Sequence, residues 1–111
     1  MTVPLYEAKA ELFRTLGHPV RIRVLELLSE RDMAVHELLA DIAIEASALS
    51  QQLAVLRRTG LVRQRREGGE VVYSLLVDGT RELLASGRVL LRQLAVAGDD
   101  LVRELDEAGE G

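Results

Sequence analysis

The 111-residue chain contains no cysteine and no tryptophan, and its aromatic residues are only two tyrosines and one phenylalanine. Without cysteine it can form neither disulfides nor thiolate metal sites, and thiol oxidation cannot regulate it. No stretch approaches the roughly 18 apolar residues of a membrane-spanning helix. The first residues lack the basic and then apolar order of a signal peptide. We therefore expect one cytoplasmic domain over 1–111, with no membrane contact.

Signatures of catalysis are also missing. The two histidines are separated in the chain, His18 in the turn before Pro19 and His36 on a later predicted helix, and no Gly-x-x-x-x-Gly-Lys phosphate loop is present. We find neither a nucleophile paired with a base nor a metal triad. His18 precedes a proline and is expected to be structural, as a helix cap or a packed ring. The sequence therefore predicts a protein that is not an enzyme and has no cofactor.

Positive charge is confined to one segment of the chain. The net charge is −4, but residues 50–75 carry five arginines against two glutamates, whereas 1–49 and 76–111 are both acidic. Because salt limits the reach of a charge to about 8 Å, a local basic patch can bind phosphates even on an acidic protein. The segment 50–75 is therefore the candidate contact with nucleic acid.

Apolar spacing predicts several helices. Pro19 suits the first position of the second helix, and Arg21 is among the side chains expected to face outward from it. A polar turn is expected from Ser29 to Met33. The helices before the basic segment are predicted over 4–16, from Pro19 to the polar turn, and over 35–42.

A further helix is expected over 47–59. Ser47 is a good N-cap because its hydroxyl can accept a backbone N–H, and Gly60 supplies the stop. A stripe of leucines must face the core: Leu49, Leu53 and Leu56. After Gly60 the apolar period changes to two, and a Gly-Gly pair joins two short runs as in a hairpin. The sequence thus predicts a helix-turn-helix over about 35–59 and a wing over about 62–76.

The C-terminal third carries an apolar seam. Its leucines recur at the 4-3-4 spacing of a coiled-coil helix, which predicts a partner helix. We therefore expect a partner helix to cover this seam, which spans about 80–105 and is followed by a frayed tail from Asp106.

The 47–59 helix begins with hydroxyl and amide side chains. The same end of the second helix in a helix-turn-helix reads base edges in the major groove, and glutamine can bond N6 and N7 of adenine. Arginines on phosphates fix the position of the protein without reading sequence. The predicted DNA-binding residues are Ser47, Ser50, Gln51, Gln52, Arg57, Arg58, Arg63, Arg65 and Arg66. The alternatives are a merely solvated helix face and a winged helix that contacts only proteins; the basic hairpin favours DNA.

These motifs resemble those of the ArsR/SmtB family of small dimeric bacterial repressors. LGHPVRIRVLELL resembles the family's second helix, SALSQQLAVLRRTGLV its recognition helix and REGGEVVYSL its wing, together covering about residues 5–95. The resemblance implies a mainly α (α+β) winged helix-turn-helix of about five helices and a two-stranded wing. It also implies a homodimer formed by the first and last helices, at about 4–16 and 80–105, with these expected interface residues: Leu5, Leu12, Leu83, Leu90, Leu94 and Leu101. The implied dimer binds a palindromic DNA operator and blocks transcription until an effector weakens the binding. Ser50, Gln51 and Gln52 fall on the base-reading positions; many members have histidine at the position of Gln52, so an operator preference does not carry over.

The metal sites of that family have no counterpart in these residues. The third helix, VHELLADI, contains no cysteine, and the last helix offers arginines, which cannot deprotonate to bind a metal, but no histidine. The remaining candidates are His36 with Glu37 or Asp41, and an acidic group near the C-terminus: Asp99, Asp100 and Glu104. We expect no metal site, which leaves three alternatives for regulation: a small-molecule effector, a protein partner, or constitutive DNA binding that is controlled by expression level.

Overall fold

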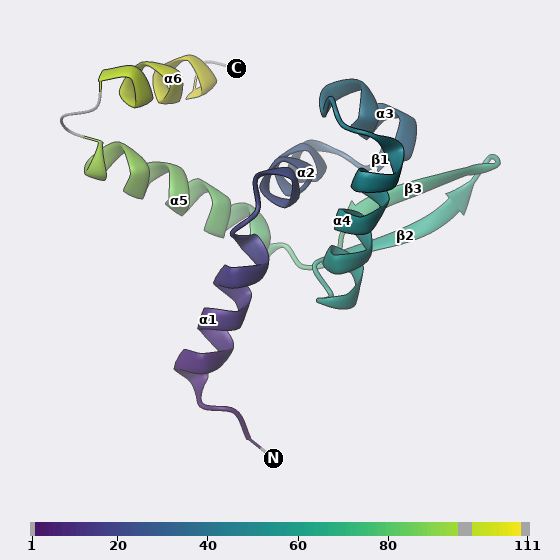
Figure 1. Cartoon of the computed structure of the whole chain (residues 1–111), viewed down its shortest axis with the longest axis horizontal. Helices are drawn as coiled ribbons and strands as arrows, with labels where there is room; N and C mark the ends of the chain where they lie inside the picture. The colour runs from purple at the N-terminus through teal and green to yellow at the C-terminus, as the bar shows by residue number, and fades with distance from the viewer. Residues whose placement is uncertain (1, 96–98, 110–111) are drawn as a thin grey trace. The chain divides into compact units, whose positions relative to one another are not determined.

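The computed structural model of the chain describes residues 2–95 and 99–109. These residues form two compact units, one ending at Thr80 and the other beginning at Arg81 (Figure 1). None of the described helices is by itself long and apolar enough to cross a membrane; α3 and α4 reach that length and composition only as a pair, across a bend of 113°.

Four helices of the first unit lie close to their predicted positions. They are α1 (Leu5–Leu16), α2 (Pro19–Glu30), α3 (Val35–Asp41) and α4 (Ala46–Arg58). The carbonyl of Pro4 starts α1 by accepting from the backbone N–H groups of Glu7 and Ala8, at 3.0 and 3.1 Å. His18 caps α2, because its Nδ1 accepts from the N–H of Val20 at 3.2 Å. The structural role predicted for this histidine is therefore confirmed.

The segment after α2 differs from the prediction. The helix continues through Ser29, whose hydroxyl donates to the carbonyl of Leu25 at 2.7 Å and so stays inside the last turn. The buried pair Met33 and Ala34 forms a short strand, β1 (Met33–Ala34). The predicted polar turn from Ser29 to Met33 is therefore wrong at both ends, and only the residues between helix and strand remain as a turn.

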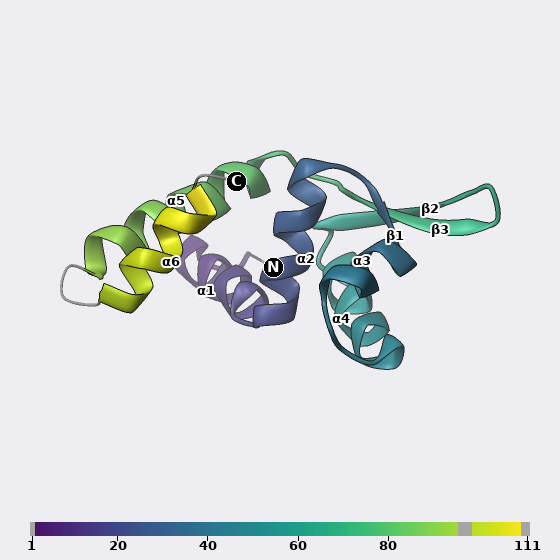
Figure 2. The ribbon, with the colours of Figure 1, turned by 90° about the horizontal axis from the view of Figure 1, so that it is seen from above.

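The wing is part of a three-stranded antiparallel sheet with the order β1-β3-β2, rather than the two strands expected. β2 (Val62–Glu67) pairs with β3 (Glu70–Leu75), and β1 pairs with the other edge of β3. Gly68 and Gly69 have φ angles of 59° and 84°, which a two-residue type I′ turn requires. Figures 1 and 2 both show the β2–β3 ribbon extending beyond the helices of this unit, with its turn at the far end.

The core of the first unit lies where α2 packs on α4 and where both helices contact the sheet. The three leucines of the predicted α4 stripe are all less than 2 % exposed, which confirms it: Leu49, Leu53 and Leu56. Equally buried neighbours come from the other elements: Val24, Leu25, Leu28, Leu38 and Val62. Truncating one such leucine to alanine lowers the free energy of unfolding by about 2–5 kcal/mol, so this row fixes α4 against the core. The opposite face of the helix is left to solvent.

The second unit is built of two helices in place of the single stretch predicted over 80–105. α5 (Gly79–Leu94) begins just before it, and α6 (Asp99–Gly109) follows. Asp106 forms an ion pair with Arg92 of α5. The tail predicted to fray from Asp106 is therefore helical as far as Gly109.

Candidate nucleic-acid interface

The turn between α3 and α4 presents the first half of α4 to solvent. Ser47, Ser50 and Gln51 are exposed, and Gln52 is half-buried. The helix starts earlier than predicted, because the carbonyl of Glu45 accepts the first bond from the N–H of Leu49 at 3.1 Å. Ser47 is therefore not the N-cap, and its hydroxyl stands on the first turn of the exposed polar face.

The opposite end of α4 is basic. Arg57 and Arg58 are exposed in its last turn, where positive charge complements the helix dipole. Gly60 then adopts a φ of 83°, the left-handed conformation predicted for it, and turns the chain into β2. A polar front half, a basic end and the wing thus follow one another within 30 residues of chain, from Ala46 to Leu75.

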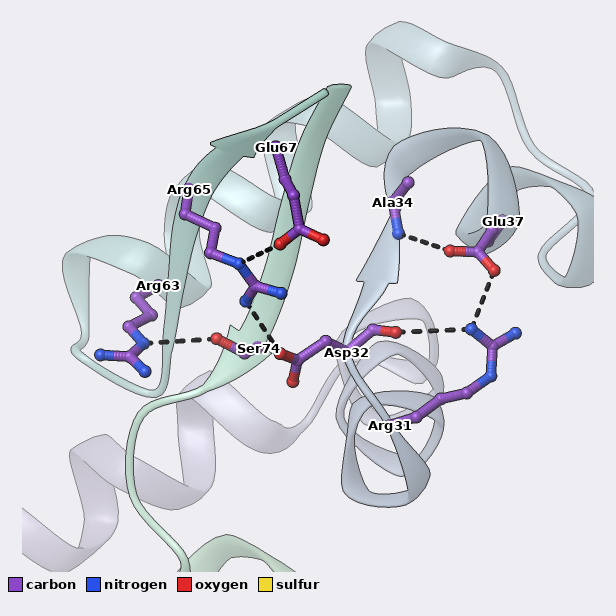
Figure 3. A network of polar contacts seen from close by, with 8 residues as sticks. All are labelled: Arg31, Asp32, Ala34, Glu37, Arg63, Arg65, Glu67 and Ser74. Carbon is purple, nitrogen blue, oxygen red and sulfur yellow. Dashed lines mark hydrogen bonds and ion pairs between the residues drawn. The ribbon is translucent and has the colours of Figure 1, made fainter. Parts of the chain in front are cut away.

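The arginines of the wing lie on two faces of β2. Arg63 and Arg65 share one face because alternate residues of a strand point the same way, and Arg66 lies on the other. Arg63 Nε donates to the Oγ of Ser74 across the strand pair, at 3.4 Å (Figure 3). Sequence reasoning brought these arginines together as one group; the strand period separates Arg66 from the other two.

Arg65 is paired with two acids in the free protein. Its Nη1 lies 2.8 Å from Oδ2 of Asp32 on the connection between α2 and β1, and its Nε lies 2.8 Å from Oε2 of Glu67 (Figure 3). The hydrogen bonds that Arg65 donates, first to Asp32 and then to Glu67, raise the pKa of Arg65 above its usual range. A phosphate that binds Arg65 must therefore compete with both carboxylates.

Gln52 has a partner that the sequence did not indicate. Arg21 of α2 was expected to face outward, but it is half-buried, and its Nε donates to the Oε1 of Gln52 at 2.8 Å. Its Nη1 donates to the carbonyl of Thr15 in α1 at 3.0 Å. The partners are 31 residues apart in sequence, so no local pattern could have revealed the contact.

The candidate metal ligand His36 pairs with an acid other than those proposed to join it. Its Nδ1 lies 3.0 Å from Oε1 of Glu70 in β3. Asp41 pairs with Arg23. Glu37 accepts from the N–H of Ala34 at 2.9 Å and from Arg31 at 2.8 Å, in that order the main causes of its lowered pKa (Figure 3).

The acidic candidates near the C-terminus are described only in part. Glu104 is exposed on α6, and the side chains of Asp99 and Asp100 lie outside the described part of the structure. No group of three or more His, Asp or Glu side chains that could hold a metal ion occurs among the residues described in 2–95 and 99–109.

The predicted dimer residues lie on two apolar faces, one in each unit. On α1, Leu5 and Leu12 are exposed, together with Tyr6 and Phe13, which the prediction did not include. On α5, Leu90 and Leu94 are 55 % and 72 % exposed, beside Val89 and Leu91, whereas Leu83 is half-buried. The side chain of Leu101 lies outside the described part of the structure.

Comparison with known proteins identifies the family. A model of the bacterial regulatory proteins of the arsR family matches residues 18–64, which contain α2, α3 and α4. The HTH-type transcriptional regulator Rv0081 of Mycobacterium tuberculosis strain H37Rv is 54 % identical over 92 residues, which cover 82 % of this chain and 81 % of that protein. The chain belongs to the ArsR family. It is thus a DNA-binding transcriptional regulator rather than an enzyme.

Two solved structures and a further relative extend the comparison. The crystal structure of M. tuberculosis Rv0081 superimposes with a TM-score of 0.76 at 53 % identity, covering 84 % of this chain and 94 % of that one. Mb0332 of Mycobacterium bovis, described as a homodimeric winged helix-turn-helix DNA-binding domain, gives 0.72 at 25 % identity over 85 % and 88 %. A biofilm growth-associated repressor of Agrobacterium fabrum is 40 % identical over 75 residues, 68 % of this chain and 64 % of that protein. The winged helix-turn-helix fold is therefore confirmed.

Proposed function

We propose that this ArsR-family regulator is a homodimeric repressor that binds a palindromic operator through the 47–59 helix and the 62–76 wing. The observation that carries the proposal is the two-sided character of α4. One side is a fully buried row of leucines, and the other exposes Ser47, Ser50 and Gln51 at the N-terminal end. A helix of this kind fits the major groove, where hydroxyls and amides read base edges.

The arginines give the binding its electrostatic part. Arg57, Arg58 and Arg66 are exposed, and none of them has an acidic partner among the residues that the structure describes. Arginines in such positions bind phosphates, which sets the register of the helix in the groove but carries no sequence information. Affinity is therefore expected to fall steeply with salt, and specificity to depend on the first half of α4.

The apolar faces of α1 and α5 support a dimer. Each leaves large apolar side chains in water, which is costly unless a second surface covers them. A second copy of the chain offers the same faces, and Mb0332 of M. bovis is described as homodimeric. Two copies related by a two-fold axis would meet two half-sites about 34 Å apart, one turn of DNA, which makes the operator palindromic.

Repression follows from where such a dimer would sit. A tightly bound dimer on a promoter excludes the polymerase, and the A. fabrum relative is described as a repressor. The protein would act in the cytoplasm, where bacterial DNA lies. A small molecule or a protein partner that weakens DNA binding would relieve the repression.

Footprinting on the DNA upstream of the gene tests the proposal. We expect one protected region with two inverted half-sites about 10 base pairs apart, centre to centre. Repeating the assay with EDTA and with a panel of divalent metals would separate a metal response from other effectors. Protection that is equally strong on unrelated DNA of the same length would contradict sequence-specific repression.

A further inference from the structure

The guanidinium of Arg21 on α2 contacts both the end of α1 and α4. Arg21 donates from Nε to the side chain of Gln52 at 2.8 Å and from Nη1 to the backbone carbonyl of Thr15 at 3.0 Å. Both bonds are partly shielded from water. Because the guanidinium is planar and is held at two points, its orientation toward Gln52 is well defined.

This contact sets which end of the Gln52 amide faces which way. A glutamine amide has an oxygen that accepts and an amino group that donates, and a rotation of the amide by about 180° exchanges them. Arginine only donates. The oxygen of Gln52 must therefore point back toward Arg21 on α2, and the amino group must point away from it.

The direction of the amide changes what Gln52 can read. A free glutamine can bond adenine with both ends, donating to N7 and accepting from the N6 amino group. With its oxygen turned toward Arg21, Gln52 offers the groove only its amino group. Guanine presents two neighbouring acceptors there, O6 and N7, and no donor.

From this geometry we propose that Arg21 determines operator specificity without touching DNA. It acts as a positioning residue that holds the Gln52 amide so that the base pair under Gln52 is read as guanine rather than adenine. The inference rests on the proposed function, in which the N-terminal half of α4 lies in the major groove.

Selection of binding sites from a library of randomised half-sites tests this. The full-length wild-type protein is compared with Gln52→Ala, which identifies the position read by Gln52. Wild type should select guanine there. Arg21→Met should shift the preference toward adenine by about tenfold, since a bidentate base contact contributes roughly that much discrimination. Arg21→Lys keeps a donor beside the Gln52 oxygen and should retain guanine.

Arg23→Met is the matched control. Arg23 lies on the same helix and pairs with Asp41 and Glu26 instead of with α4. Its loss should leave every base preference unchanged, although it removes the same side chain and the same charge. Thermal unfolding of each variant shows whether it is folded.

A chemical substitution in the DNA tests the same point on the unaltered protein, even if Arg21→Met does not fold. Replacing that guanine by 7-deazaguanine removes the N7 acceptor, and should weaken wild type severalfold while leaving Gln52→Ala unaffected.

Four results would overturn the inference. They are an adenine preference in wild type, no effect of Arg21→Met on the base selected, no position that depends on Gln52, and wild-type binding that tolerates 7-deazaguanine. If wild type enriches no sequence at all, the proposed function fails as well. An enriched palindrome without a position that depends on Gln52 overturns only the role of Arg21.

Discussion

The two carboxylates beside Arg65 should hold back DNA binding. Asp32 and Glu67 each lie 2.8 Å from the Arg65 guanidinium, so in the free protein this wing arginine is already neutralised. The double variant Asp32→Asn with Glu67→Gln keeps the side-chain shapes and removes both charges. We therefore expect Arg65 to become available for one additional phosphate.

The magnitude follows from counterion release. Each phosphate neutralised on duplex DNA adds about 0.9 to the slope of log affinity against log salt, so the variant's slope should steepen by about 0.9. If the variant and the wild type bind equally at 1 M salt, this difference in slope makes the affinity of the variant about eightfold higher at 0.1 M salt. Unfolding temperature should change little, because all three side chains are substantially exposed and such pairs are screened by water.

Fluorescence anisotropy of labelled operator DNA at several salt concentrations measures the slope directly. The chain offers a matched control in Arg23, which also pairs with one aspartate and one glutamate, and whose pKa is also raised, chiefly by Asp41. Asp41→Asn with Glu26→Gln makes the same change of charge away from the wing. An equal gain in the control would show a general charge effect, and an unchanged or shallower slope in the Asp32 and Glu67 variant would refute the reasoning.

Three further predictions concern α4, the dimer and stability in acid. The double variant Gln51→Ala with Gln52→Ala should reduce binding to the operator by at least tenfold in competition assays, whereas non-specific binding should stay within about twofold. The reason is that the amides read bases and the arginines bind phosphates. Equal losses on operator and unrelated DNA would exclude base reading. Leu90→Glu should give a monomer in sedimentation, since it buries a charge in the proposed apolar interface, and an unchanged dimer mass would place the interface elsewhere. Glu37→Gln should lower the unfolding temperature at neutral pH but not in acid below the folded-state pKa of Glu37. The N–H of Ala34 lowers that pKa, so the ionised carboxylate stabilises the fold above the unfolded-state pKa. This contribution is lost as the pH falls through the lower folded-state pKa. A pH-independent difference would show that the Glu37 charge plays no part.

The parts of the fold that depend on local rules could be predicted. The α4 leucine row follows from the 3.6-residue period, the I′ turn at Gly68 and Gly69 from their freedom to take positive φ, and the start of α2 from Pro19. The polar residues in the N-terminal half of α4 were predicted as a group because the same 3.6-residue period that buries the leucines leaves these residues on the other faces of the helix.

Short elements and helix ends escaped prediction. β1 is only two residues long, so it shows no period, and it exists because β3 has a free edge to pair with. The N-terminus of α4 depends on a backbone bond to Glu45 rather than on the hydroxyl of Ser47. Neither effect has a signal in the residue types alone.

The amino-acid sequence by itself determined the class of this protein: a helix with one apolar and one polar face, a basic hairpin after it, and apolar seams on the first and last helices. Only the tertiary structure decided how the charged side chains are used. Arg21 meets Gln52 across 31 residues of chain, and Arg65 meets Asp32 across 33. Local spacing controls which face a residue lies on, but a long flexible side chain finds its partner only after the helices and strands have packed together.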